Sequence, residues 1–260
     1  MSETVLVEDA GGVRTLTLHR PAQRNALTAE MQQELIAALL AAAEDRECRV
    51  VVLSGGGEVF CAGLDLKSLA AMGGHTPAQH TADAERIALM FRTLYECPKP
   101  TIAVVNGAAI GGGAGLATIC DFTIAAPAAW FAFTEVKIGF VPAIVSAYLV
   151  LQVGEKRARD LLLTGRQVNA EDAHRIGLLN ELAPPGALME RAQALAATLM
   201  KNSPESLRLT KALLAAQSKR WLDAAVAEAM AANAAARATA DFREGVAAFL
   251  EKRPPLWAQQ

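Results

Sequence analysis

The sequence has no long apolar segment. A membrane-spanning helix needs about 18 to 20 consecutive apolar residues, and no run in these 260 residues approaches that length. The first residues also lack the positive segment followed by an apolar stretch that marks a secretory signal peptide. We therefore expect a cytoplasmic chain that makes no contact with a membrane.

Cysteines are few and far apart, and neither sign of charge predominates. The four cysteines and four histidines show no metal-ligand spacing, so we expect buried thiols, no disulfide framework and no metal site. The formal net charge is -2, and the basic residues are scattered. This pattern lacks the clustered positive surface that nucleic-acid binding requires. The cysteines are Cys48, Cys61, Cys97 and Cys120.

The first half of the sequence alternates strand and helix patterns. Residues 13–20 alternate apolar and polar side chains, whereas residues 49–55 and 100–107 are continuous apolar runs rich in β-branched residues, typical of strands covered on both faces. Between the strands, Thr28 predicts the N-cap of one helix, and residues 84–97 predict a second helix that ends before a proline. This order favours an α/β fold with a parallel sheet.

The last third of the sequence has a helical composition. After about Gly154, Ala, Leu, Glu, Lys and Arg predominate, and Pro184 with Pro185 separates two helical portions. No apolar heptad persists for three repeats, which argues against a coiled coil. We expect these helices to pack on one another or on another subunit.

Two glycine-rich segments follow predicted buried strands. Gly111, Gly112 and Gly113 lead into the apolar helix pattern AGLATIC, and a second glycine-containing segment, residues 54–72, leaves the preceding strand in the same way. A helix start presents free N–H groups, and glycine lets a ligand approach the backbone closely. Adjacent parallel strands would bring both sets of N–H groups together, which indicates an oxyanion hole. A tight turn with close helix packing is the alternative interpretation.

Four segments together resemble the crotonase family, the enoyl-CoA hydratase/isomerase superfamily. Two shorter segments near the end, GLLNEL and AFLEKRPPLW, are also similar to the family, so the resemblance covers almost the whole chain. It implies an α/β spiral of ββα turns over residues 1–195, a C-terminal helical trimerisation part over residues 196–260, and homotrimers or homohexamers. The four segments are HRPAQRNALT, FCAGLDLKSL, NGAAIGGGAGLATICD and FTEVKIGFVP.

The resemblance also implies catalytic roles. It places the two oxyanion donors at the backbone N–H groups of Leu64 and Gly112, and the acid–base carboxylate at Glu135. The apolar setting WFAFTEVKIGF should favour the neutral form of Glu135 and raise its pKa. Many hydratases of the family carry a second glutamate at the position of Gly115, and this sequence has none there.

The substrate implied by the resemblance is an acyl-CoA thioester, with coenzyme A carried as part of the substrate and no separate cofactor. The segments GGGAGL and KIGFVPAIVSAYLV resemble hydratases of branched or carboxylated 2-enoyl-CoAs such as 3-methylglutaconyl-CoA. In this interpretation Glu135 alone activates water, and a distal substrate carboxylate or a polar group such as Ser146 helps to position it. Two alternatives stay open: a 3-enoyl to 2-enoyl-CoA isomerase, and a non-catalytic acyl-CoA-binding protein.

The coenzyme A contacts follow from the same resemblance. Arg24 would meet the phosphates, because a guanidinium group suits them. The pantetheine and adenine would lie along Ala26, Ala62, Asp65 and Leu66, largely through the backbone, with Asp65 also predicted to cap a helix. Phe249 and Lys252 resemble a C-terminal pair that touches coenzyme A from the same chain or from a neighbouring subunit.

Overall fold

Residues 3–258 form two sheets. The computed structural model describes residues 3–258, with the side chain of Leu66 outside that description. The larger sheet has the order β1-β2-β3-β4-β6-β9, with β1 and β2 antiparallel and the other neighbours parallel. The smaller sheet has the order β5-β7-β8. The strands are β1 (Val5–Ala10), β2 (Val13–Leu18), β3 (Val50–Gly55), β4 (Thr101–Val105), β5 (Ala108–Ile110), β6 (Phe122–Ala125), β7 (Trp130–Ala132), β8 (Val168–Asn169) and β9 (Glu181–Leu182).

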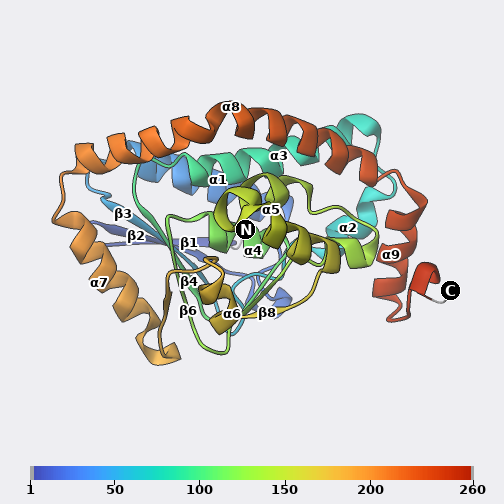
Figure 1. The fold of residues 1–260 in the computed structure, drawn as a ribbon, viewed down its shortest axis with the longest axis horizontal. Coiled ribbons are helices and arrows are strands. Elements are labelled where there is room, and N and C mark those ends of the chain that lie inside the picture. Colours follow the sequence, from blue (N-terminus) through green and yellow to red (C-terminus); the bar gives the residue numbers. More distant parts are fainter. Residues whose placement is uncertain (1–2, 259–260) are drawn as a thin grey trace.

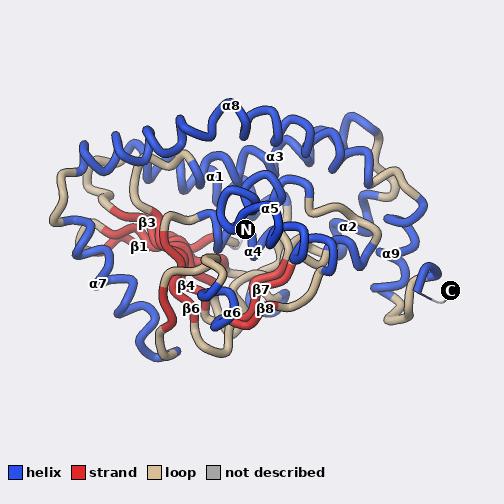
Figure 2. Tube along the Cα trace, in the orientation of Figure 1, coloured by secondary structure: helices blue, strands red, loops and turns tan. Residues whose placement is uncertain are grey.

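Helices lie beside and above the larger sheet (Figures 1 and 2). The α-helices are α1 (Ala29–Glu44), α2 (Leu66–Met72), α3 (Pro77–Tyr95), α4 (Gly112–Ile119), α5 (Ala143–Thr164), α6 (Ala170–Arg175), α7 (Leu188–Met200), α8 (Pro204–Ala236) and α9 (Ala240–Leu250). Short 3-10 turns are η1 (Pro21–Gln23), η2 (Glu135–Ile138), η3 (Pro185–Ala187) and η4 (Leu256–Ala258). Among residues 3–258, no helix combines the length and the apolar character that crossing a membrane requires.

The predicted parallel sheet is confirmed in its central strands. β3 and β4 are buried on both faces, as their continuous apolar runs predict, and they pair in parallel with Leu53 opposite Ala103. β2 pairs with β3 so that Leu16 faces Leu53. Because both strands run in the same direction, the segments that leave β3 and β4 emerge at the same edge of the sheet.

Helix α1 begins where the sequence predicts, whereas α3 begins earlier. The Thr28 side chain accepts a hydrogen bond from the Met31 N–H (3.2 Å), which confirms the N-cap. The predicted start of the second helix, Ala84, is wrong by about two turns. Thr76 and Gln79 form a capping box that nucleates α3 at Pro77, and such a box satisfies N–H groups that have no partner within the helix.

The C-terminal helices pack on the rest of the chain. Figure 1 shows α8 running along the length of the molecule beside α3, and α8 also contacts α5. Leu222, Val226 and Ala229 of α8 join the main hydrophobic core. The predicted division between residues 195 and 196 falls within α7 and stays a prediction.

Helix α9 packs against η2 and α2 at one end of the molecule (Figure 1). Phe140 and Phe242 meet there with ring centres 5.2 Å apart, in a second small core. The approach is close because Gly245 has no side chain: a Cβ there would lie 2.3 Å from the backbone carbonyl of Ile138. The backbone of α9 therefore rests directly on the turn that begins with Glu135.

We predict that Gly245→Ala lowers the free energy of unfolding by roughly 1–3 kcal/mol, because the added methyl group overpacks a backbone contact and outweighs the better helix propensity of alanine. Urea unfolding followed by circular dichroism measures the change. Gly186→Ala is the matched control, since a Cβ at Gly186 meets no atom within 4 Å. Equal effects of the two substitutions would contradict the close-contact explanation.

Candidate active site

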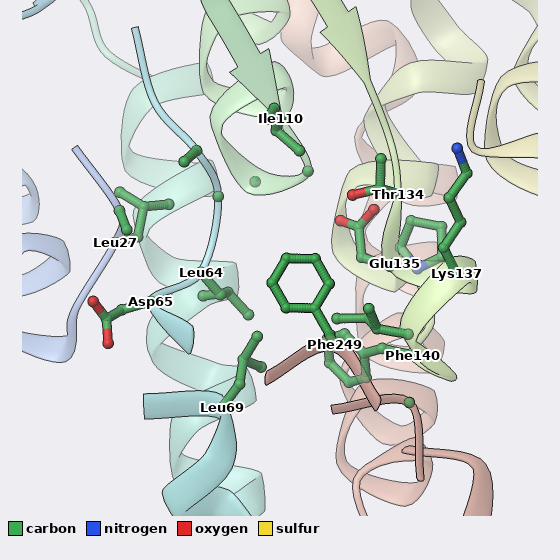
Figure 3. A pocket seen from close by; sticks show the side chains of 18 of the residues that line it. Leu27, Leu64, Asp65, Leu69, Ile110, Thr134, Glu135, Lys137, Phe140 and Phe249 are labelled. Atoms are coloured by element: carbon green, nitrogen blue, oxygen red, sulfur yellow. The ribbon is translucent and has the colours of Figure 1, made fainter. Parts of the chain in front are cut away.

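A pocket of about 970 Å³ opens where α9 and η2 meet the segments that leave β3 and β5. Its walls are mostly apolar. Figure 3 shows the side chains around it, with the Phe249 ring projecting into the space between Leu64 and Glu135 in this view. Apolar lining residues include Leu27, Leu64, Leu69, Ile87, Met90, Ile110, Phe140, Val141, Ile144, Val145 and Phe249.

The two predicted glycine segments lie against each other, as expected. The Cys61 N–H donates to the Ala108 carbonyl (3.2 Å), and the Ile110 N–H donates to the Cys61 carbonyl (2.9 Å). Gly113 has no room for a side chain, because a Cβ there would lie 2.4 Å from the Cys61 carbonyl oxygen. Gly63 has φ of +85°, and a Cβ there would lie 2.8 Å from the Ile110 carbonyl oxygen. The glycines therefore allow both a tight turn and close contact between the two backbone segments.

The N–H groups of Leu64 and Gly112 are free, and both residues line the pocket. The bridge between Leu27 and Leu64 uses the Gly63 carbonyl and the Asp65 N–H, so the Leu64 N–H points away from Leu27. Gly112 is the first residue of α4, where N–H groups have no partner within the helix. Among the described residues, neither N–H donates to any acceptor. Two backbone donors therefore face the pocket.

Glu135 is held beside the start of α4. β5 pairs in parallel with β7, and the Gly111 N–H donates to the Ala132 carbonyl (2.7 Å). The chain reaches Glu135 three residues after β7 ends. Gly111 has φ of +54°, and a Cβ there would lie only 3.0 Å from Oε1 of Glu135. The carboxyl group therefore lies against the backbone of Gly111, next to Gly112.

The Glu135 carboxyl group has an unusual environment. Its Oε2 is buried and has no hydrogen-bond partner within the described part of the chain. Burial raises the pKa of Glu135 to about 7, because the charged form loses its hydration. Lys137 is exposed and forms no ion pair with it. Glu135 can therefore both accept and release a proton near neutral pH.

No second carboxylate can stand at Gly115 in this packing. A Cβ at Gly115 would lie 2.6 Å from Cε1 of Phe91 and 2.8 Å from Cγ2 of Val145. The other acidic residue that lines the pocket, Asp65, is occupied: it accepts from the N–H groups of Lys67 and Ser68 and pairs with Arg20 (3.2 Å). The predicted capping role of Asp65 is confirmed, and Glu135 is the carboxylate left for chemistry.

Most of the residues predicted to contact coenzyme A line the pocket. Arg24, Ala26 and Ala62 line the pocket together with Asp65 and Phe249. Arg24 is exposed, and its side chain forms no ion pair with any described residue. The sequence analysis overlooked Lys67, which also lines the pocket, although its place directly after the glycine segment was a usable signal.

The roles predicted for Lys252, Ser146 and Leu66 stay predictions. Lys252 does not line the pocket; the neighbouring Arg253 does, with its guanidinium bound to Glu244 (2.6 Å). Ser146 is also absent from the lining of the pocket, because its hydroxyl donates to the Ala143 carbonyl (2.6 Å) within α5. The side chain of Leu66 lies outside the described residues.

The four cysteines lie in the interior of the protein. Cys48, Cys61, Cys97 and Cys120 are free and buried, which confirms their prediction as buried thiols. Burial raises the pKa of the Cys61 thiol, which lies beside the glycine segment, to about 12. Within the described part of the chain, no group of three or more His, Cys, Asp or Glu residues is placed to hold a metal ion.

The chain is similar to known proteins of one family over nearly its whole length. A family model described as Enoyl-CoA hydratase/isomerase matches residues 8–260. A protein of Thermus thermophilus, provisionally named as an enoyl-CoA hydratase, is 47% identical over 250 residues, covering 95% of this chain and 98% of that protein. The 2,3-dehydroadipyl-CoA hydratase of Escherichia coli is 35% identical over 256 residues, covering 98% of each. The crystal structure of an enoyl-CoA hydratase/isomerase from Xanthobacter autotrophicus superposes with a TM-score of 0.89 at 30% identity, over 97% of this chain and 98% of that chain.

The raised pKa of Glu135 predicts a dependence of stability on pH. The pKa lies at about 7 in the folded protein against an ordinary value of 4.5. The stabilisation from this bound proton is therefore fully present below about pH 4.5 and is lost as the pH rises through about 7. Glu135→Gln keeps no titrating group, so its stability relative to wild type should increase by about 3 kcal/mol across that range.

Urea unfolding of both proteins at several pH values measures this difference. Glu85→Gln is the matched control, because Glu85 is exposed on α3 and lies outside the pocket. A difference between Glu135→Gln and wild type that stays constant with pH would show that Glu135 is not held in its neutral form.

Proposed function

This chain belongs to the enoyl-CoA hydratase/isomerase family, and we propose that it adds water to the double bond of a 2-enoyl-CoA with Glu135 as its only acid–base group. The observation that carries this proposal is the unpartnered Glu135 carboxyl group, with its pKa raised to about 7, beside two free backbone N–H groups. The family is enzymatic, so the non-catalytic interpretation loses its main support.

The backbone donors would stabilise the charge that develops on the thioester carbonyl oxygen. When a nucleophile adds to C3 of the enoyl group, the electrons of the double bond move to that oxygen as an enolate. The N–H groups of Leu64 and Gly112 would donate to it, and one well-placed donor contributes about 3 kcal/mol to the transition state. Because backbone groups act, the apolar side chain of Leu64 does not interfere.

Glu135 would move the proton in both halves of the addition. As an ionised carboxylate it accepts a proton from water while the water oxygen bonds to C3. The neutral acid then returns a proton to C2 as the enolate collapses, and the product is a 3-hydroxyacyl-CoA. A pKa near 7 suits both steps, because neither protonation state is strongly disfavoured at neutral pH.

For the acyl group, we propose a branched or carboxylated chain, of which 3-methylglutaconyl-CoA is an example. The support is the glycine at position 115 with its apolar neighbours Phe91 and Val145, and the 35% identity to the 2,3-dehydroadipyl-CoA hydratase. Arg24 and Lys67 at the pocket would bind the coenzyme A phosphates, since both are exposed cations with no acidic partner among the described residues.

Assembly into homotrimers or homohexamers is also proposed. Large apolar side chains remain exposed on α8 in the single chain, and their burial between subunits would remove them from water. These side chains are Leu209, Leu213, Leu214 and Trp221.

A 3-enoyl to 2-enoyl-CoA isomerase is the second candidate. The observation in its favour is that Glu135 is the only carboxylate among the described pocket residues without a partner, since Asp65 is engaged by Arg20 and by backbone N–H groups. One carboxyl group is sufficient to carry a proton between two carbons of the same substrate, with no water consumed.

We predict that Glu135→Gln reduces turnover by about 10²–10⁴-fold, because an amide can neither accept nor return the proton. Mass spectrometry of products separates the candidates: hydration adds one water to a 2-enoyl-CoA, whereas isomerisation of a 3-enoyl-CoA leaves the mass unchanged. Glu85→Gln is the control. Full activity of Glu135→Gln on every thioester that wild type converts would remove Glu135 from the mechanism.

We predict that Arg24→Ala raises the KM for enoyl-CoA roughly two- to tenfold at low salt, with little change in kcat, because one phosphate contact is lost. The difference from wild type should shrink at high salt, since salt screens exposed charges. Lys156→Ala removes an exposed cation on α5 outside the pocket and serves as the control. An unchanged KM for Arg24→Ala at low salt would exclude a role in phosphate binding.

A further inference from the structure

One wall of the pocket contains a buried amide with no partner. Asn233 on α8 lines the pocket and is only 4% exposed. Its Oδ1 has no hydrogen-bond partner among the described residues, and no described residue bonds to its amide nitrogen. A buried amide without a partner is costly, so its place in an otherwise apolar wall points to a polar group of the ligand.

A buried guanidinium lies one helical turn beyond this amide. Arg237 follows Asn233 by four residues, and its side chain is 0% exposed. Nη1 pairs with Asp83 of α3 (3.1 Å), but Nε and Nη2 have no partner within the described part of the chain. Its Cζ lies 5.8 Å from the centre of the Phe140 ring, and Phe140 lines the pocket.

The acyl pocket leads toward this ion pair. α3 and α8 pack side by side, and Ile87 of α3 lines the pocket as Asn233 of α8 does. Asp83 lies one turn before Ile87 on α3, and Arg237 lies one turn after Asn233 on α8. Because residues four apart share one face of a helix, the Asp83–Arg237 pair lies directly beyond the part of the wall that Ile87 and Asn233 form.

The charges around this pair do not balance. Asp83 is shared between Arg237 and Arg86, and His75 lies 3.3 Å from the same carboxylate. Burial and the nearby Arg237 lower the pKa of His80, which favours its neutral form. The guanidinium groups of Arg237 and Arg86 are thus two cations that face the single carboxylate of Asp83. A buried excess of one positive charge is unfavourable unless another anion arrives.

We propose that this end of the pocket is a carboxylate subsite for the far end of the acyl chain. The Nδ2 group of Asn233 donates a hydrogen bond to the terminal carboxylate, and Arg237, which lies behind the wall and does not line the pocket, balances its charge. The substrate class is then a 2-enoyl-CoA that ends in a carboxylate rather than in a methyl group. This inference deepens the proposed function and rests on it only in that a CoA thioester occupies the pocket.

Binding of saturated thioesters tests the subsite without requiring catalysis. Isothermal titration calorimetry measures the affinities for hexanoyl-CoA and adipyl-CoA, whose six-carbon acyl chains end in a methyl group and in a carboxylate. The same comparison is made for acyl chains of five, seven and eight carbons. We expect wild type to bind at least one carboxylate-ended member about tenfold or more tightly than its methyl-ended partner, the size of effect given by charge-assisted hydrogen bonds. Equal affinities within every pair would overturn the proposal.

Asn233→Asp is the sharpest variant, because it keeps the shape of asparagine and adds a negative charge. The new carboxylate should replace the ligand as the partner of Arg237, four residues on. The preference for carboxylate-ended thioesters should therefore disappear or reverse. Asn233→Leu, a second variant, should lose the preference without gaining a charge. An unchanged preference in both variants would overturn the role of Asn233.

The enzymatic assay separates this subsite from the proposed function. Hydration of hex-2-enoyl-CoA that depends on Glu135, with no preference for carboxylate-ended chains at any length, would retain the proposed function and overturn the subsite. A preference for adipyl-CoA in calorimetry, lost in Asn233→Asp, would support the subsite even if no thioester is hydrated, in which case the proposed function alone fails.

Discussion

The site depends on a close contact between two backbone segments that only glycine permits. A Cβ at Gly113 would lie 2.4 Å from the Cys61 carbonyl oxygen, and a Cβ at Gly63 would lie 2.8 Å from the Ile110 carbonyl oxygen, so neither position has room for a side chain. Because the segments touch through their main chains, the free N–H groups of Leu64 and Gly112 face the same pocket. A third glycine, Gly111, extends the contact to the carboxyl group of Glu135. Any larger side chain at these positions would separate the donors from the acid–base group.

This packing also explains why the pKa of Glu135 is raised. Buried against Gly111 with an unpartnered oxygen, its carboxyl group has lost hydration without gaining a cation, and its pKa rises to about 7. A salt bridge to Lys137 would have lowered the pKa and fixed the charge. In the mechanism that we propose, this buried carboxyl group lies where a proton is exchanged, and the close packing of α9 on η2 holds its turn in position.

Short sequence patterns predicted the features of the fold that depend on residues close together in the chain. The Thr28 cap, the buried parallel strands β3 and β4, and the convergence of their glycine segments all followed from short stretches of sequence. The spiral came from the family resemblance, because pairing of β5 with β7 depends on contacts distant in the chain. The place of Asn233 in the pocket was not predicted, because the sequence of the alanine-rich helix α8 does not indicate which of its faces lines a pocket. The resemblance named Lys252, and the pocket of the single chain shows that the next residue, Arg253, also lies near the site.

Backbone groups form one end of the pocket, whereas side chains form the other. The reacting end uses backbone N–H groups fixed by glycine contacts, so few substitutions there are compatible with the fold. The wall at α3 and α8 presents the side chain of Asn233, with the Asp83–Arg237 pair behind it. Exchange of a side chain there alters charge and hydrogen bonding but leaves Leu64, Gly112 and Glu135 in place. The acyl group that the enzyme accepts can therefore change independently of the chemistry that it performs.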